Sequence, residues 1–123
     1  MTISGGTITA AGSDGAAGIG GGYYNGATVT ITGDAVIKNA SSTKYGAGIG
    51  GGMYGKGEVT ISGGDVTAHG GHTAAGIGGG FRGSGDVTIL GGTVTAIPAE
   101  GSNSNVTGIG GGVGCDETST GRI

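Results

Sequence analysis

Apolar β-branched side chains alternate with polar or small ones in short runs along the chain. One run, Val59–Ser62, is followed by a glycine pair and by a second run, Asp65–Ala68, in which Val66 is apolar. Alternation with a period of two is typical of strands, because successive side chains point to opposite faces. A third run, Ala74–Gly78, completes the unit. The pattern therefore predicts three short strands per unit, joined by glycine turns.

Three motifs repeat in phase along the chain. Gly-Ile-Gly-Gly-Gly recurs at spacings of 30, 28 and 32 residues, starting at Gly18, Gly48, Gly76 and Gly108. A Thr-Ile pair recurs at spacings of 28, 30 and 28, with its isoleucine at Ile3, Ile31, Ile61 and Ile89. Five residues later comes a further apolar position, at Ile8, Val36, Val66 and Val94. We divide this single domain into repeats 1–28, 29–58, 59–86 and 87–116, with 117–123 as a tail or partial rung.

The alternation assigns a face to each position. We expect the first strand of each repeat to bury Val29, Ile31, Val59, Ile61, Val87 and Ile89. The second strand should bury Ile8, Val36, Val66 and Val94. The third should bury Ile19, Ile49, Ile77 and Ile109 beside Ala17, Ala47, Ala75 and Thr107. The outward positions of the first strand are then Thr30, Thr32, Thr60, Ser62, Thr88 and Leu90. This arrangement predicts an all-β fold, a right-handed parallel β-helix of about four rungs.

The composition supports this fold. The chain has 36 glycines in 123 residues, and Thr, Ile and Val together equal them in number. Glycine and β-branched residues are poor helix formers, so a helical bundle is excluded. Collagen is excluded as well, because the chain has one proline and no glycine at every third position.

Alternate glycines of the third strand are expected to face outward. They would form a flat surface without side chains that another backbone could approach closely. These residues are Gly18, Gly20, Gly22, Gly48, Gly50, Gly52, Gly76, Gly78, Gly80, Gly108, Gly110 and Gly112.

The loops after the glycine motif begin with an apolar residue, which we expect to close a corner of the core. These residues are Tyr23, Met53, Phe81 and Val113. The next residue in the first three loops, Tyr24, Tyr54 or Arg82, should be exposed along one edge. This edge could stack on sugar rings or make lateral contacts.

The charges argue against nucleic acid as a partner. The chain carries five Lys or Arg residues against eight Asp or Glu residues, a net charge of −3, and lacks a basic stripe. No apolar run is long enough to predict a membrane span. The lone Cys115 has no partner for an internal disulfide, and its role stays open.

Sites for metals or catalysis have little support in the sequence. We expect no obligatory cofactor. Glu58 and Asp86 occupy equivalent positions on neighbouring repeats and could together hold calcium through oxygen ligands. His69 and His72, three residues apart, could form a metal pair, but polar turn residues explain them better. The eight acids are scattered over the repeats, so we expect no enzyme.

The outward threonines favour one further hypothesis. Flat threonine ladders on a β-solenoid could order water and bind ice. Ala35, Ile37, Asp65 and Thr67 interrupt one outward surface and Leu90 another, so exposed strand threonines explain the pattern equally well.

The segment from Val59 to Gly80 resembles the glycine-rich repeats of large bacterial surface proteins. Those repeats are similar to pectate-lyase-like β-helical adhesive regions, some of them carbohydrate-binding. The resemblance covers all four repeats and implies an extracellular or cell-surface location. It implies no particular ligand-binding residue.

The first and last rungs of a solenoid expose unpaired backbone groups, and the sequence shows no evident N-terminal cap. The tail could begin a fifth rung at 118–120 or cover the end. We therefore expect a non-enzymatic structural or adhesive solenoid that associates with itself, end to end or laterally, or with neighbouring repeats of a longer chain. A carbohydrate-binding module, with a polysaccharide as partner, is the alternative.

Overall fold

The computed structural model describes residues 1–98, 108–112 and 120–122, and strands are the only regular elements in these ranges. The strands are short because glycine pairs and other turn residues interrupt every apolar run. The chain turns at these points and never extends one strand beyond seven residues.

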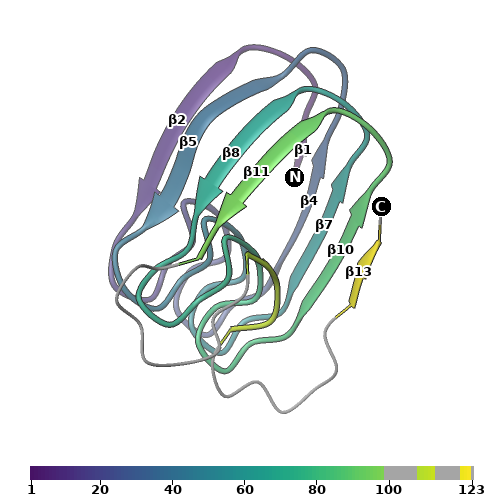
Figure 1. The fold of residues 1–123 in the computed structure, drawn as a ribbon. Coiled ribbons are helices and arrows are strands. Elements are labelled where there is room, and N and C mark those ends of the chain that lie inside the picture. Colours follow the sequence, from purple (N-terminus) through teal and green to yellow (C-terminus); the bar gives the residue numbers. More distant parts are fainter. Residues whose placement is uncertain (99–107, 113–119, 123) are drawn as a thin grey trace.

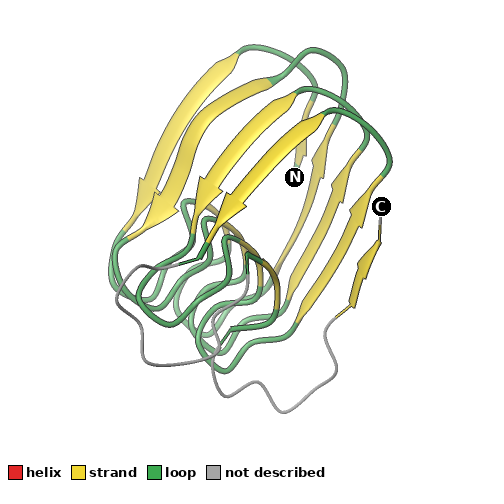
Figure 2. Cartoon of the chain, viewed as in Figure 1, coloured by secondary structure: helices red, strands yellow, loops and turns green. Residues whose placement is uncertain are grey.

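Three parallel sheets wrap around a common core (Figures 1 and 2). Sheet A contains β1 (Thr2–Ile3), β4 (Ala27–Ile31), β7 (Gly57–Ile61), β10 (Gly85–Ile89) and β13 (Thr120–Arg122). Sheet B contains β2 (Thr7–Gly12), β5 (Val36–Ser42), β8 (Asp65–His69) and β11 (Thr93–Ile97). Sheet C contains β3 (Ile19–Gly20), β6 (Ile49–Gly50), β9 (Ile77–Gly78) and β12 (Ile109–Gly110). The chain visits the sheets in the order A, B, C, so the prediction of a parallel β-helix is confirmed.

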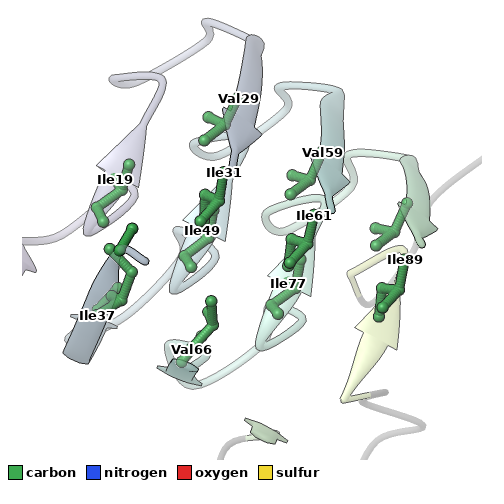
Figure 3. Close-up of a cluster of buried hydrophobic side chains, with 14 residues drawn as sticks. Ile19, Val29, Ile31, Ile37, Ile49, Val59, Ile61, Val66, Ile77 and Ile89 are labelled. Carbon is green, nitrogen blue, oxygen red and sulfur yellow. The ribbon is translucent and has the colours of Figure 1, made fainter. Parts of the chain in front are cut away.

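Equivalent residues of successive repeats stack directly on one another. In sheet A, Val29 pairs with Val59, which pairs with Val87, and the neighbouring isoleucines keep the same register. The core is a set of such ladders from all three sheets, built from Ile, Val and Ala (Figure 3). The inward assignment of the first strand is confirmed, as is that of Ile19, Ile49 and Ile77 in the third.

One inward assignment in sheet B is wrong. The spacing placed Val36 in line with Ile8 and Val66, but Ile37 pairs with both of them and is only 1% exposed. Val36 is half-buried. The register shifts between Ile37 and Ala40, where β5 carries one more residue than β8. This bulge brings Ala40 back onto the inward face. Ile37 therefore does not interrupt an outward surface.

The glycines of the third strand do not form an open surface, which corrects a second expectation. Gly48, Gly52, Gly76 and Gly80 are buried, and so are Gly50, Gly78, Gly110 and Gly112. A Cβ on Gly48 would lie 2.6 Å from the carbonyl oxygen of Ala40. Only Gly20 is exposed, and Gly18, Gly22 and Gly108 are half-buried. Neighbouring backbone occupies the space where side chains would be.

Around Gly52 and Gly80 the covering backbone belongs to the loops on either side of sheet C. The Met53 N–H donates to the Gly15 carbonyl oxygen at 2.7 Å, and the Phe81 N–H donates to that of Tyr45 at 2.8 Å. Each bond joins the loop before one sheet C strand to the loop after the next. Close approach of three backbone segments leaves no room for a Cβ. The glycines therefore serve internal packing at this corner.

Candidate functional site

All five aromatic residues of the chain lie together on the loops beside sheet C. They are Tyr23, Tyr24, Tyr45, Tyr54 and Phe81, and we call this set the aromatic row. None of them belongs to the buried core. Aromatic side chains bury the most apolar area per residue, so their placement outside the core distinguishes this surface.

The rings of the aromatic row contact one another across three repeats. Tyr24 and Tyr54 are stacked, with centroids 5.0 Å apart and planes 9° from parallel. Tyr23 meets Tyr24 edge-on at 4.3 Å, and Phe81 meets Tyr54 at 6.2 Å. Tyr45, from the loop before β6, lies 5.6 Å from Phe81. The contacts are continuous along the solenoid axis.

The backbone holds three equivalent residues in the same unusual conformation. Tyr24, Tyr54 and Arg82 have φ angles of 64°, 63° and 59°. The left-handed region costs a non-glycine residue about 1–2 kcal/mol. Hydrogen bonds between loops hold the turn, since the Tyr24 N–H donates to Met53 and the Tyr54 N–H to Phe81. The same strained position in three repeats gives these side chains one common direction.

Two cations flank the row. The Lys44 ammonium lies 5.8 Å from the Tyr45 ring centroid, and the Arg82 guanidinium lies 5.5 Å from that of Phe81. Both distances suit a cation–π contact. A side-chain hydrogen bond with Tyr24 raises the pKa of Tyr23 above its usual 10.0, and desolvation and the neighbouring phenols act in the same direction. Tyr23 therefore keeps its phenol proton to a higher pH than a free tyrosine.

The structure places the predicted edge residues as expected. Tyr24 is 64% exposed, Tyr54 is 44% exposed, and Arg82 is also exposed. The expectation that Tyr23 closes a corner of the core is wrong, because it is 50% exposed. Its ring lies against Gly15, outside the core. Met53 and Phe81 are half-buried, and Val113 lies outside the described residues.

Sequence reasoning missed Tyr45 as a member of this surface. Tyr45 lies in a loop before a sheet C strand, whereas the other four aromatic residues lie in loops after one. The repeat pattern gives Tyr45 no equivalent aromatic residue. Its contact with Phe81 follows from the packing of the two loops against each other.

The outward threonines form one regular ladder on sheet A. Thr2, Thr30, Thr60 and Thr88 pair in register. The ladder on one side of it changes from Thr28 to the carboxylates of Glu58 and Asp86. On the other side, Thr32 is followed by Ser62 and Leu90 in successive repeats. Across β1, β4, β7 and β10 only the central ladder is threonine at each level, so the surface is narrower than a flat threonine face.

Glu58 and Asp86 pair in register on neighbouring strands, as predicted. The Lys56 ammonium lies 3.7 Å from a Glu58 carboxylate oxygen, and both side chains are about half exposed. No three His, Cys, Asp or Glu side chains come together among the described residues. A calcium ion at the two carboxylates therefore stays a prediction.

The two histidines have different surroundings. His69 Nδ1 lies 2.8 Å from the side-chain oxygen of Asn39, on the neighbouring repeat. His72 is exposed in a turn. The hydrogen bond with Asn39 gives His69 a structural partner. Cys115 lies outside the described residues.

In the described ranges, no helix has the length and apolar character needed to cross a membrane. A comparison with curated proteins found no match, and neither did one with solved structures. A family model described as a beta helix repeat matches residues 2–23, 25–53 and 59–81. These three segments each cover most of one of the first three repeats and together make up more than half of the chain, so the protein belongs to the beta helix repeat family.

Proposed function

We propose that the protein is a non-enzymatic structural and adhesive β-solenoid whose contact surface is the aromatic row. The carrying observation is that all five aromatic residues lie together outside the core, three of them exposed, while the core uses only Ile, Val and Ala. Aromatic residues, tyrosine especially, are enriched where proteins contact partners. A rigid scaffold that directs Tyr24 and Tyr54 outward from equivalent positions suits repeated contacts along one axis.

The partner class that we propose is an extended polysaccharide. The faces of Tyr24 and Tyr54 are turned toward each other, so a sugar ring cannot lie between them. What the row offers is a line of contacting aromatic rings that spans successive repeats. A polymer that lies along the solenoid axis contacts several of these groups at once, whereas a single sugar contacts few. The resemblance to surface-protein repeats supports the same partner and an extracellular location.

The absence of catalysis is also part of the proposal. Glu58 and Asp86 stand side by side on the outer face of sheet A, and Lys56 is an ion-pair partner of Glu58. A glycosidase needs two carboxylates on either side of the scissile bond, one of them protonated. Two exposed carboxylates on one flat face do not provide that arrangement.

Retention on immobilised polysaccharides tests the contact surface. We expect the wild-type protein to bind at least one of cellulose, chitin and an acidic polysaccharide. The variant Tyr24→Ala/Tyr54→Ala removes the stacked pair, and we expect the affinity to fall about tenfold or more, since each aromatic contact contributes roughly 1 kcal/mol.

Leu90→Ala is the matched control, because Leu90 is 70% exposed and lies outside the aromatic row. Its retention should equal that of the wild type. Equal retention of the tyrosine variant, or no wild-type binding to any of the three polymers, would overturn the proposed contact surface.

Ice binding has less support than adhesion to a polymer. The one regular threonine ladder is flanked by carboxylates on one side and by Leu90 on the other. A flat surface that orders water needs adjacent regular ladders, and sheet A offers one.

A further inference from the structure

We propose that Tyr24 and Tyr54 form a site of oxidative cross-linking, at which hydrogen peroxide acting through a haem peroxidase joins the two rings by a carbon–carbon bond. The product is a dityrosine that ties the loop after β3 to the loop after β6. The bond is a covalent staple between the first two repeats. This chemistry goes beyond the proposed polysaccharide contact and does not depend on it.

The reaction balances with hydrogen peroxide as the oxidant. Each phenol gives up one electron and one proton and becomes a phenoxyl radical, whose unpaired electron lies partly on the ring carbons beside the C–O bond. One such carbon from each ring forms the new bond, and the hydrogens that these carbons carried move to the oxygens and restore both phenols. Hydrogen peroxide takes up the two electrons and two protons and leaves as two molecules of water. The protein therefore loses two hydrogen atoms.

The stacked pair presents its rings in the orientation that this bond needs. A bond between two ring carbons forms perpendicular to both ring planes, so the rings must face each other when it forms. The planes of Tyr24 and Tyr54 are 9° from parallel, and their centroids are 5.0 Å apart. Holding the reacting groups face to face replaces a collision between molecules by a reaction within one. Both side chains are exposed, so an oxidant can reach them.

The backbone keeps the two rings together. The Tyr24 N–H donates to the Met53 carbonyl oxygen at 2.8 Å, and the Gly52 N–H donates in the opposite direction to that of Asn25 at 3.1 Å. The φ angles of Tyr24 and Tyr54 are 64° and 63°, so both side chains leave their loops in the same direction. The stack therefore follows from the packing of one loop on the other.

The other ring contacts of the aromatic row are not suited to the same reaction. Tyr23 meets Tyr24 edge-on at an interplanar angle of 77°, so no bond can form perpendicular to both planes. Tyr54 and Tyr45 each contact Phe81. A phenylalanine ring has no phenol proton to give up, so these contacts do not couple. Among the ring contacts of the described residues, the Tyr24–Tyr54 pair is therefore the one that can form a dityrosine.

Oxidation of the purified protein by hydrogen peroxide and a haem peroxidase tests the site. We expect the monomer to lose the mass of two hydrogen atoms and to gain dityrosine fluorescence. Because the pair reacts within one molecule, the yield per molecule should stay the same when the protein is diluted. A monomer of unchanged mass, or a yield that falls in proportion to dilution, would overturn the inference.

Tryptic peptides locate the bond. Cleavage after Lys38, Lys44 and Lys56 places the two residues in different peptides, 1–38 and 45–56. We expect these two peptides to be joined after oxidation. Each also contains a second tyrosine, Tyr23 in one and Tyr45 in the other, so single variants are needed to assign the bond.

Phenylalanine variants make this assignment. Tyr54→Phe keeps the ring and removes the phenol, so the monomer should no longer lose two hydrogen atoms. Tyr45→Phe and Tyr23→Phe are the matched controls, because each removes the other phenol of one of the two peptides. Both should cross-link as the wild type does. Cross-linking that persists in Tyr54→Phe, or that is lost in either control, would contradict the assignment.

Urea unfolding tests whether the bond acts as a staple. A cross-link between residues 24 and 54 restricts the unfolded chain, so it should raise the midpoint of unfolding of the oxidised wild type. Oxidised Tyr54→Phe should unfold at the same midpoint as untreated Tyr54→Phe. An unchanged midpoint in the cross-linked wild type would contradict a staple between the repeats.

Discussion

Gly22 and Gly52 occupy the same position in successive repeats, but their surroundings differ. A Cβ on Gly22 would have nothing within 4 Å, whereas one on Gly52 would meet the carbonyl oxygens of Gly22 and Gly15. The difference arises because a neighbouring repeat and the loop before β3 cover Gly52. How much a glycine of this motif matters for stability therefore depends on which repeats cover it. The motif alone does not reveal this difference.

This difference predicts unequal effects of the same substitution. Gly52→Ala should lower the free energy of unfolding by about 1–3 kcal/mol, because the backbone around it must shift to admit the methyl group. Gly22→Ala should change it by less than about 0.5 kcal/mol. Urea unfolding of the two variants measures both values. Equal destabilisation by the two substitutions would show that the loops do not pack as described.

At the scale of the strands, the repeat period allowed most of the fold to be predicted. A ladder uses the same kind of residue at every level, so Ile31, Ile61 and Ile89 recur in phase and identify one inward position of sheet A. The bulge in β5 could not be predicted in this way. Val36 and Ile37 are both β-branched and adjacent, so alternation alone does not decide which one faces the core.

The bulge gives a direct comparison within one strand. Ile37→Ala should cost about 2–5 kcal/mol of stability, because it removes a fully buried side chain from a closely packed ladder. Val36→Ala, at a half-buried position, should cost clearly less. Thermal or urea unfolding compares the two. A larger loss for Val36→Ala would place Val36 in the core and contradict the register of β5.

The candidate site was only partly predictable at this scale. Tyr24, Tyr54 and Arg82 share one loop position, so the repeat places them on one edge before the structure is known. The stacking of Tyr24 on Tyr54 and the contact of Tyr45 with Phe81 depend on distances between loops. The buried glycines were missed for the same reason, because a sequence repeat does not say which loops fold over one another.

At the scale of the whole molecule, the solenoid is a stack of similar units, each of which contacts mainly its neighbours. β5 and β8 have a strand on each side, whereas β2 and β11 have one within the described residues. Stability in such an array is approximately a sum of repeat and interface contributions. The repeats at either end of the described stack should therefore open more readily than the central ones.

The central claim is that the repeats are held together by parallel ladders between successive turns, and amide hydrogen exchange measured by mass spectrometry tests it most directly. We predict the slowest exchange in β5, β7 and β8, which have partners on both sides, and faster exchange in β2 and β11. Peptides from equivalent strands provide the comparison, because their sequences are similar and their positions in the stack differ. Equal protection of all these strands, or the slowest exchange in β2, would contradict the stacked arrangement.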